Sequence, residues 1–477
     1  MAHPLIIQGG MGVAVSGWPL ANAVARLGQL GTVSGTALGA ILARRLQMGD
    51  PGGHLQRALS NFPFPAMADR ILKTFLIPGG KAPNAPFKTN PPPMLNADRA
   101  SLELTLTANF AEVYLAKEGH SGVVGINYLE KIQLPTLPSL FGAMLAGVDY
   151  ILMGAGIPRA IPGILDSFAE GKPASLLIDV IGALPGEQFI DTFNPAEFCG
   201  APPPKMARPF FLGIVSSDIL AATLAKKSSG RIDGFVVEGE TAGGHNAPPR
   251  GTLQLSDTGE PLYGPRDRPN IARMRDLGLP FWLAGAYGRP EQLREALSLG
   301  ATGVQVGTAF AFCEESGITP EIKHEVIRLS RAGETRVFTD PLASPTGFPF
   351  KVVELKGTLS EESAYQQRRR VCDLGYLRHL YRREDGTVGY RCPSEPVAEY
   401  VRKGGEEAHT HGRKCICNCL PATVGLPQLR KKSDDTISYE LPLLTAGNDA
   451  ANVKDFLPEG SDTYSVADVI CRLRGNL

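Results

Sequence analysis

Short apolar runs recur along the chain, and each ends in a glycine or a polar residue, which is the pattern of buried β-strands. Between these runs, apolar residues repeat at helical spacing, and the alternation predicts successive βα units. The eight apolar runs are Leu5–Ile7, Leu30–Ser34, Val123–Asn127, Tyr150–Met153, Phe210–Val215, Phe235–Val237, Pro280–Ala284 and Gly303–Val306. Eight strands favour an α/β fold of the (β/α)8 TIM-barrel type, because open doubly wound sheets more often have fewer strands.

Three segments interrupt or follow this alternation. A proline-rich stretch at 78–93 can neither continue a helix nor sit in a central strand, so we expect it to run over the surface. Residues 173–209 read as an insertion whose structure the pattern does not predict. We therefore expect a barrel over residues 1–315 that contains this insertion, followed by a cysteine-containing C-terminal extension or cap over residues 316–477.

The stretch IDGFVVEGETAGGHNAPPR, residues 232–250, combines a predicted strand with titratable side chains at its carboxyl end. Glu238 closes the apolar run, and the pair Gly243 and Gly244 comes directly before His245. Two adjacent glycines beside a titratable side chain indicate a backbone that approaches a ligand closely, and a flat ring is the candidate. Active sites of (β/α)8 barrels lie at the carboxyl ends of the strands, where these residues fall.

Glycines also follow the last two predicted strands. Gly285 and Gly288 come after the seventh strand, Pro290 is suited to the first position of a helix, and Gly307 and Thr308 follow the eighth strand. Loops of this kind present unpaired backbone N–H groups to an anion, so the pattern predicts a phosphate site. The alternative is that these glycines only form tight barrel turns.

The composition narrows the class of partner. The chain has 477 residues with 48 Lys and Arg against 48 Asp and Glu, so its net charge gives no reason to expect nucleic acid or an acidic membrane as partner. It contains no apolar run as long as a membrane span and no N-terminal signal pattern. We therefore expect a cytoplasmic enzyme that acts on a small molecule.

Three motifs together resemble one family. The segments IIQGGMG, VEGETAGGH and LAGAYGRPEQLREALSLGATGVQVGTAF are similar to those of the nitronate monooxygenase, or 2-nitropropane dioxygenase-like, family of FMN-dependent barrels. That family also includes FMN-containing enoyl-acyl carrier protein reductases. The resemblance covers roughly residues 3–315, with the motifs in the order of the family.

The resemblance implies a role for each matching residue. His245 matches the catalytic histidine beside the reactive edge of the flavin. The positions that match cofactor-binding residues are Gln8, Gly9, Gly10 and Met11 under the isoalloxazine, Asn127 and Glu238 near the ring or ribityl chain, Gly243 and Gly244 against the flavin, and Gly285, Gln305, Val306, Gly307 and Thr308 at the phosphate. The chain departs from the family at Glu238, where Gln is frequent, at Gly9-Gly10, where Ala-Pro is frequent, and at Ala309, where Arg is frequent.

Three functions are consistent with these residues. The favoured one is oxidation of alkyl nitronates with O2, in which His245 orients or protonates the substrate beside FMN. The alternative is an NAD(P)H-dependent enoyl reductase that acts in trans on carrier-bound chains of a lipid or polyketide synthase, which would make an acyl carrier protein a partner. The third is a non-catalytic scaffold on a barrel fold. A homodimer is compatible with each of them.

The C-terminal extension carries two further clusters. Five cysteines, with His409 and His411 nearby, could supply soft ligands to zinc, but Cys-x-Cys is not the usual Cys-x2-Cys spacing, so we assign no metal and expect buried free thiols. The cysteines are Cys372, Cys392, Cys415, Cys417 and Cys419. The basic run at 368–370 is expected to be a solvated face of a helix, with contact to a nucleotide phosphate or a carrier protein as the alternative.

Overall fold

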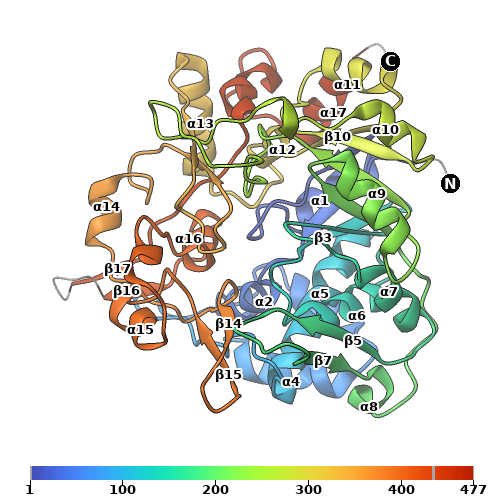
Figure 1. Cartoon of the computed structure of the whole chain (residues 1–477), viewed down its shortest axis with the longest axis vertical. Helices are drawn as coiled ribbons and strands as arrows, with labels where there is room; N and C mark the ends of the chain where they lie inside the picture. Colours follow the sequence, from blue (N-terminus) through green and yellow to red (C-terminus); the bar gives the residue numbers. More distant parts are fainter. Residues whose placement is uncertain (1–2, 432–435, 476–477) are drawn as a thin grey trace.

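A computed structural model describes residues 3–431 and 436–475, and eight parallel strands form the centre of its larger part (Figure 1). The order in the sheet is β1-β11-β10-β9-β8-β4-β3-β2, so neighbours in space follow one another along the chain. The strands are β1 (Ile6–Gln8), β2 (Gly31–Ser34), β3 (Val124–Leu129), β4 (Tyr150–Gly154), β8 (Phe210–Val215), β9 (Gly234–Glu238), β10 (Phe281–Ala284) and β11 (Gly303–Val306). This confirms the predicted (β/α)8 barrel.

The sheet closes between its first two strands. Ile7 and Leu30 form a parallel bridge, and the N–H of Gln8 donates to the carbonyl of Leu30 at 2.9 Å. Large side chains fill the interior, as in other barrels of eight strands. Trp282 is fully buried there, and its indole N–H donates to the carbonyl of Pro4 at 2.8 Å. The barrel is thus a packed core, and any ligand must bind at one of its ends.

Helices surround the strands and begin where the sequence predicts them. Asp98 accepts a hydrogen bond from the N–H of Ser101 and caps the longest helix, and Pro290 occupies the first turn of its helix, as expected. The helices of this part are α1 (Trp18–Arg26), α2 (Leu38–Gln47), α3 (His54–Ser60), α4 (Pro65–Phe75), α5 (Arg99–Lys117), α6 (Thr136–Leu145), α7 (Ile161–Ala169), α9 (Asp218–Lys227), η1 (Pro265–Asp267), α10 (Ile271–Asp276), α11 (Pro290–Ser298) and α12 (Thr308–Ala311).

The insertion after the fourth barrel strand is a β-hairpin followed by a short helix. Strands β5 (Ala174–Ile178) and β7 (Phe189–Phe193) pair antiparallel, and α8 (Pro195–Cys199) follows them. The short strand β6 (Val180–Ile181) pairs in parallel with β14 (His379–Arg382), which belongs to the C-terminal part. The insertion therefore connects the barrel to the cap.

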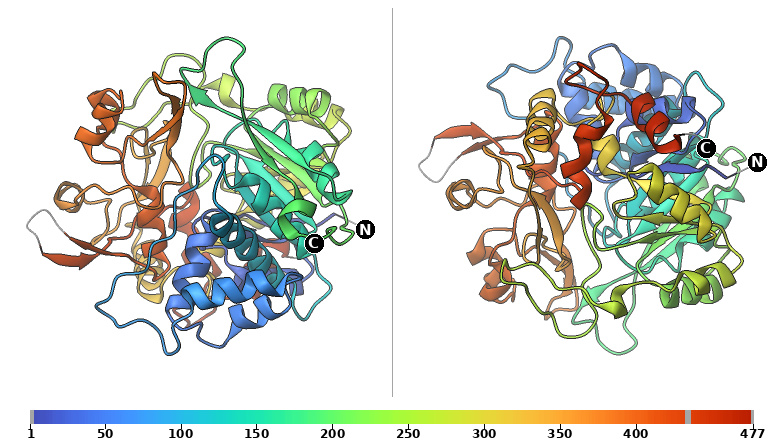
Figure 2. Two further views of the ribbon diagram at one scale, coloured as in Figure 1. Left: turned by 90° about the horizontal axis from the view of Figure 1, so that it is seen from below. Right: turned by 90° about the horizontal axis from the view of Figure 1, so that it is seen from above.

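The segment after the barrel strands forms a cap beside the barrel (Figures 1 and 2). It contains little repetitive structure, and its strands form short hairpins. Its elements are α13 (Pro320–Ala332), β12 (Val337–Asp340), β13 (Phe350–Val353), α14 (Glu362–Gln367), β14, β15 (Val388–Arg391), α15 (Val397–Arg402), η2 (Glu407–Thr410), α16 (Ile416–Thr423), β16 (Leu429–Lys431), β17 (Ile437–Tyr439) and η3 (Asn448–Phe456). In the part of the chain that the structure describes, no helix has the length and apolarity needed to cross a bilayer.

The end of the chain returns to the barrel. Helix α17 (Val466–Arg474) packs against α1 and α11, and the preceding η3 packs against α12 and α13. Ser465 caps α17: its hydroxyl accepts from the N–H of Asp468 at 3.3 Å, and the carboxylate of Asp468 accepts from the N–H of Ser465 at 2.7 Å. The cap is therefore tied to the barrel at both of its ends, at β11 and at α17.

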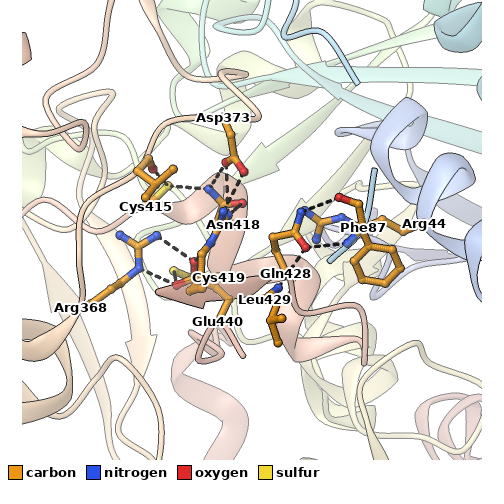
Figure 3. Close-up of polar contacts among 12 residues, drawn as sticks. Arg44, Phe87, Arg368, Asp373, Cys415, Asn418, Cys419, Gln428, Leu429 and Glu440 are labelled. Atoms are coloured by element: carbon orange, nitrogen blue, oxygen red, sulfur yellow. Dashed lines mark hydrogen bonds and ion pairs between the residues drawn. The ribbon is translucent and has the colours of Figure 1, made fainter. Parts of the chain in front are cut away.

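Polar contacts also join the middle of the cap to the barrel (Figure 3). The guanidinium of Arg44, on α2, donates to the carbonyl of Leu426 at 2.7 Å. The side-chain amide of Gln428 pairs with the backbone of Phe87, accepting from its N–H at 2.8 Å and donating to its carbonyl at 3.0 Å. Phe87 lies in the proline-rich stretch at 78–93, which has no helix or strand and runs over the surface as predicted, with only Phe87 and Asn90 buried.

The basic run at 368–370 is not the solvated helical face that the sequence predicts. Helix α14 ends at Gln367, and Arg368 forms a buried ion pair with Glu440, whose side chain is 1% exposed (Figure 3). Glu440 also pairs with Arg430 at 2.9 Å. Arg370 donates to the hydroxyl of Tyr365 and to two backbone carbonyls. The prediction is wrong because the carboxylate that neutralises Arg368 lies 72 residues further along the chain.

The five late cysteines lie within the cap as free thiols. Cys415 and Cys419 belong to its apolar core, together with Ile416 and Leu420 of α16. Over residues 3–431 and 436–475, no group of three or more His, Cys, Asp or Glu side chains is arranged to hold a metal ion. Burial raises the pKa of the Cys415 and Cys419 thiols, which keeps them protonated and unreactive.

Candidate active site

The cavity that unites most of the predicted residues lies at the carboxyl ends of the barrel strands, beneath the cap. It encloses about 210 Å³. Nine glycines line it, so much of its wall is bare backbone. The predicted residues that line it are Gly9, Gly10, Met11, Asn127, Glu238, Gly243, Gly244, His245, Gly285, Gln305, Val306, Gly307 and Thr308.

The loop after β1 forms the floor of the cavity. A Cβ at Gly10 would lie 2.3 Å from the Cβ of Asn127, so only glycine lets this loop cross the end of β3. Ser16 fixes the loop, because its hydroxyl accepts from the N–H of Met11 at 2.9 Å and donates to the carbonyl of Gly9 at 3.0 Å. These two bonds fix the position of the loop.

Gln8 is the one predicted residue that does not line the cavity. Its side chain lies on the outer face of the sheet, opposite the barrel interior, where its amide N–H donates to Ser16 Oγ at 2.8 Å and its amide oxygen accepts from the N–H of Thr32 at 2.9 Å. The prediction placed it in the loop under the ring, but Gln8 is the last residue of β1, and alternation turns its side chain to the face opposite that of Ile7, which lies in the barrel interior. It acts by joining β1 to β2.

The glycine pair before His245 lies where the cap meets the barrel. A Cβ at Gly243 would come within 2.8 Å of the carbonyl carbon of Ala446. The N–H of Gly244 donates to the hydroxyl of Thr445 at 2.9 Å, and Gly244 has a φ of +78°, which suits glycine. The pair therefore allows the segment 445–447 of the cap to close one side of the cavity.

His245 stands in the cavity wall, and the cap holds its ring. Its Nε2 shares a hydrogen bond of 2.7 Å with Ser344 Oγ, and its ring meets that of Phe350 edge to face at 4.9 Å between centroids. Burial lowers the pKa of His245 to about 4, so the imidazole is neutral at physiological pH. Because Ser344 engages Nε2, a ligand in the cavity is left with Nδ1 and the ring face.

Glu238, at the end of β9, is the second titratable group at this end of the cavity. Burial raises the pKa of its carboxyl to about 7, because a carboxylate loses hydration there without gaining a cationic partner. Among the described residues that line the cavity, there is no Lys or Arg. The side chain is therefore poised to hold or release a proton near neutral pH.

Cap residues Gly447 and Asp449 lie at the carboxyl end of β11, next to Thr308, and the sequence did not predict them there. The hydroxyl of Thr308 accepts from the N–H of Gly447 at 2.9 Å and contacts the carboxyl of Asp449. Burial raises the pKa of Asp449, and its Oδ1 has no hydrogen-bond partner within the described chain. The predicted phosphate end thus contains bare loop backbone at Gly285 and Gly307 together with one buried acid.

These residues fit a flavin mononucleotide. Glycines at Gly9–Gly10 and Gly243–Gly244 line the cavity between strand ends and cap, and Gln305 Oε1 is a buried acceptor without a partner in the part of the chain described. An N–H donor on a flat heterocycle would satisfy that oxygen. A phosphate suits the glycine loops, provided that Asp449 is protonated when it binds.

Several residues of the site could not be found from the sequence. The cap supplies Ser344, Phe350, Tyr376, Cys417 and Asp449, which lie far from the glycine motifs along the chain. Cys417 was named only as one of the late cysteines, and the apolar run around 350 indicates burial and not function. Contacts made across such sequence separations depend on how the cap folds onto the barrel.

Comparison with known proteins places part of this barrel in a known class. Residues 205–341, which run from β8 through β11 into the cap, match the family model described as nitronate monooxygenase. The resemblance of this segment to the nitronate monooxygenase family is therefore confirmed.

Two curated relatives match a similar share of the chain. A (3aS,4S,5R,7aS)-5-hydroxy-7a-methyl-1-oxo-octahydro-1H-indene-4-carboxyl-CoA dehydrogenase from Rhodococcus jostii (strain RHA1) is 33% identical over 115 residues, which are 24% of this chain and 28% of that protein. A probable nitronate monooxygenase from Bacillus subtilis (strain 168) is 35% identical over 109 residues, 23% of this chain and 29% of that protein. The match thus spans less than a third of either relative.

Among solved structures, FabK from Thermotoga maritima aligns with 99% of this chain and 92% of its own, at 14% identity and a TM-score of 0.46. The enoyl reductase domain of MlnA, from the macrolactin biosynthesis cluster of Bacillus amyloliquefaciens, aligns with 100% of this chain and 96% of its own, at 12% identity and a TM-score of 0.46.

Proposed function

We propose that this protein is an FMN-dependent oxidoreductase. The observation that carries the proposal is the glycine-lined cavity at the strand ends, which holds His245, Glu238 and the free acceptor Gln305 Oε1. The match of residues 205–341 to the nitronate monooxygenase family model supports it. The test is the absorbance spectrum of the purified protein, which we expect to be that of a flavin. A colourless protein that takes up no added FMN would instead favour a scaffold.

Each part of the cavity then has a role toward the cofactor. The loop Gly9–Met11 would support the ring, Gln305 would accept a hydrogen bond from it, and the turns at Gly285 and Gly307 would receive the phosphate. When bound, FMN supplies the two-electron chemistry that side chains lack. The protein contributes a water-poor site and a proton at a defined place.

The charge of the site supports reduction of a neutral, activated double bond. No described Lys or Arg lines the cavity, and burial favours the neutral forms of both His245 and Glu238. At the end of the cavity near Glu238 and His245, such a site disfavours an anionic substrate, because no cationic side chain there compensates its lost hydration. Reduction of a C=C bond beside a carbonyl needs a proton donor for one carbon, and the protonated carboxyl of Glu238 meets that need. An NAD(P)H-dependent enoyl reductase is thus the reaction that the charges support best.

Oxidation of alkyl nitronates is the second candidate, and the name of the matched family favours it. A nitronate is an anion, so binding it here would require a proton from Glu238 or a hydrogen bond from His245. Both reactions use the same cavity. They differ in the electron donor and in the charge of the substrate.

One anaerobic titration separates the two reactions. Bleaching of the flavin spectrum by NADH or NADPH, followed by its recovery on adding a 2-enoyl thioester, would support the reductase. Bleaching by a nitronate alone, with nitronate-dependent oxygen uptake in air, would support the monooxygenase. An acyl carrier protein as the bearer of the enoyl chain is part of the reductase proposal, and it is tested by comparing carrier-bound and free thioesters.

A further inference from the structure

Two of the late cysteines meet at a pocket on the surface of the cap. Cys372 precedes β14 and Cys392 follows β15, and the hairpin between them brings their thiols into a hydrogen bond. Cys372 is half-buried and lines the pocket, whereas Cys392 is buried and does not line it. The pair therefore has one sulfur that faces a pocket and a second sulfur in contact with the first.

The pocket gives a small reagent access to Cys372. It encloses about 700 Å³. Arg369, Pro396 and Glu399 line it as well, and all three are exposed, so the pocket opens to solvent. A small uncharged molecule such as a peroxide can therefore reach the Cys372 sulfur without any rearrangement of the cap.

Contact between the two thiols makes them unequal. The S–H of Cys392 donates to the sulfur of Cys372, which lowers the pKa of Cys372 below its usual value and raises the pKa of Cys392. Burial and the carboxylate of Glu395 act against this lowering, and the charge of Arg378 supports it. Cys372 is therefore the thiol of the pair that reacts first, because the thiolate is the nucleophile.

Other thiols of the protein lack this combination. Burial raises the pKa of the Cys199 thiol to about 11, and it also raises the pKa of Cys417 and Cys419. Among the described cysteines, Cys372 is the one that combines a pocket, a second thiol in contact and a lowered pKa.

We propose that Cys372 and Cys392 form a reversible disulfide when the protein meets hydrogen peroxide. The Cys372 thiolate attacks the peroxide, the O–O bond breaks, and the products are a sulfenic acid on Cys372 and a hydroxide that takes up a proton to become water. Cys392 then attacks this sulfur, so that the S–S bond forms and the hydroxyl group leaves with the thiol proton as a second water. The two sulfurs are oxidised and the peroxide is reduced. The proposal does not depend on the proposed oxidoreductase function.

The disulfide would restrain a segment that reaches the flavin cavity, the space of about 210 Å³ at the strand ends. Asp373, next to Cys372, accepts from the side-chain amide of Asn418 on α16 at 2.8 Å (Figure 3). Tyr376 and Leu377 of the same segment line the flavin cavity. The bond would also close a loop in the unfolded chain, so the oxidised protein should unfold at a higher urea concentration than the reduced protein.

Peptide mapping of the full-length protein, with FMN added, tests the bond. After treatment with hydrogen peroxide and blocking of the remaining thiols, trypsin should release the peptides 371–378 and 392–402, each of which contains one cysteine. We expect the two to be recovered as one linked species that has lost the mass of two hydrogen atoms and is separated by dithiothreitol. Absence of this species, whichever other thiols are oxidised, would overturn the proposal.

Three variants assign the role of each sulfur. Cys392→Ser should stop at the sulfenic acid of Cys372, which dimedone traps, and Cys372→Ser should give no adduct at Cys392. Cys471→Ser is the control, because Cys471 is exposed on α17 and should not affect the link. The rise in the urea midpoint on oxidation should appear in the wild type and in Cys471→Ser. A rise of the same size in Cys392→Ser would contradict the assignment.

Reactivity before oxidation provides an independent measurement. At neutral pH, iodoacetamide should label Cys372 about tenfold faster than Cys199, which is also half-buried, because a larger fraction of Cys372 is thiolate. In Cys392→Ser this advantage should shrink, because the donor to the Cys372 sulfur is replaced. Equal labelling rates of Cys372 and Cys199 in the wild type would refute Cys372 as the thiol that reacts first.

Discussion

The buried carboxyl of Glu238 gives a prediction whose magnitude follows from the structure. Burial raises its pKa from 4.5 to about 7, so the folded state binds this proton more tightly than the unfolded state. Stability from this group is fully present below pH 4.5 and is lost as pH rises through about 7. At 1.36 kcal/mol per pH unit the loss is roughly 3 kcal/mol. This is an upper value, because water that enters the cavity hydrates the carboxylate.

Replacing Glu238 by Gln keeps the shape of the side chain and removes the charge. Glu238→Gln should therefore raise the free energy of unfolding by up to roughly 3 kcal/mol at about pH 8 and by less than about 1 kcal/mol at pH 5. Urea unfolding at the two pH values, without added FMN, measures this difference. Glu240→Gln, two positions further on and outside the flavin cavity, is the matched control. An increase in the free energy of unfolding that is equal at both pH values would refute burial of the Glu238 carboxylate as the cause of the effect.

The same substitution tests the proton donor. If Glu238 supplies the proton in reduction, kcat of the wild-type protein should fall as pH rises through about 7, because the carboxyl ionises. In Glu238→Gln this decline should be absent and kcat should be low at every pH. A Glu238→Gln variant that retains full turnover would exclude Glu238 as proton donor. The difference in unfolding free energy between the wild type and this variant would still report the buried charge of Glu238.

Four other changes test the remaining parts of the site and of the cap. His245→Ala should keep the flavin spectrum and lose turnover, and unchanged turnover would refute its catalytic role. Gly243→Ala should lower the FMN content of the purified protein, because the added Cβ would lie 2.8 Å from the cap backbone and displace it. Normal FMN content would show that the cap can shift to make room for the added Cβ. In the wild type, burial raises the pKa of the Asp449 carboxyl, so this group should ionise beside the phosphate as pH rises and weaken FMN binding. Asp449→Asn should abolish this pH dependence, which is measured by fluorescence titration of FMN at several pH values. Glu440→Gln should lower the free energy of unfolding by about 3–5 kcal/mol, because Arg368 would keep its buried charge without a carboxylate, and a loss below 1 kcal/mol in urea would contradict this.

The cap contributes side chains to the site that the glycine motifs do not contain. Barrel loops supply the floor and the two ends, but Ser344 sets the ring of His245, and Thr445 bonds the N–H of Gly244. A protein with the barrel alone would leave these groups exposed to water. The lowered pKa of His245 and the raised pKa of Glu238 both come from the burial that the cap contributes to.

The sequence by itself determined the barrel fold and the glycine-rich composition of the loops at the carboxyl ends of its strands. Eight short apolar runs, each closed by a turn, are a local signal, because the side chains of a strand buried on both faces must be apolar whatever else the chain does. The glycines at 9–10, 243–244 and 307 were equally visible. Close backbone approach requires glycine at Gly10 and Gly243, and a φ of +78° favours it at Gly244.

Only the tertiary structure determined which residues close the cavity at the carboxyl ends of the strands and which charged groups lie there. Asp449 reaches the predicted phosphate end across 141 residues from Thr308, and Arg368 pairs with the carboxylate of Glu440. Neither partner is near in sequence, so no spacing or periodicity marks it. Their positions follow from the packing of the cap onto the barrel, which depends on the complementary surfaces of both parts.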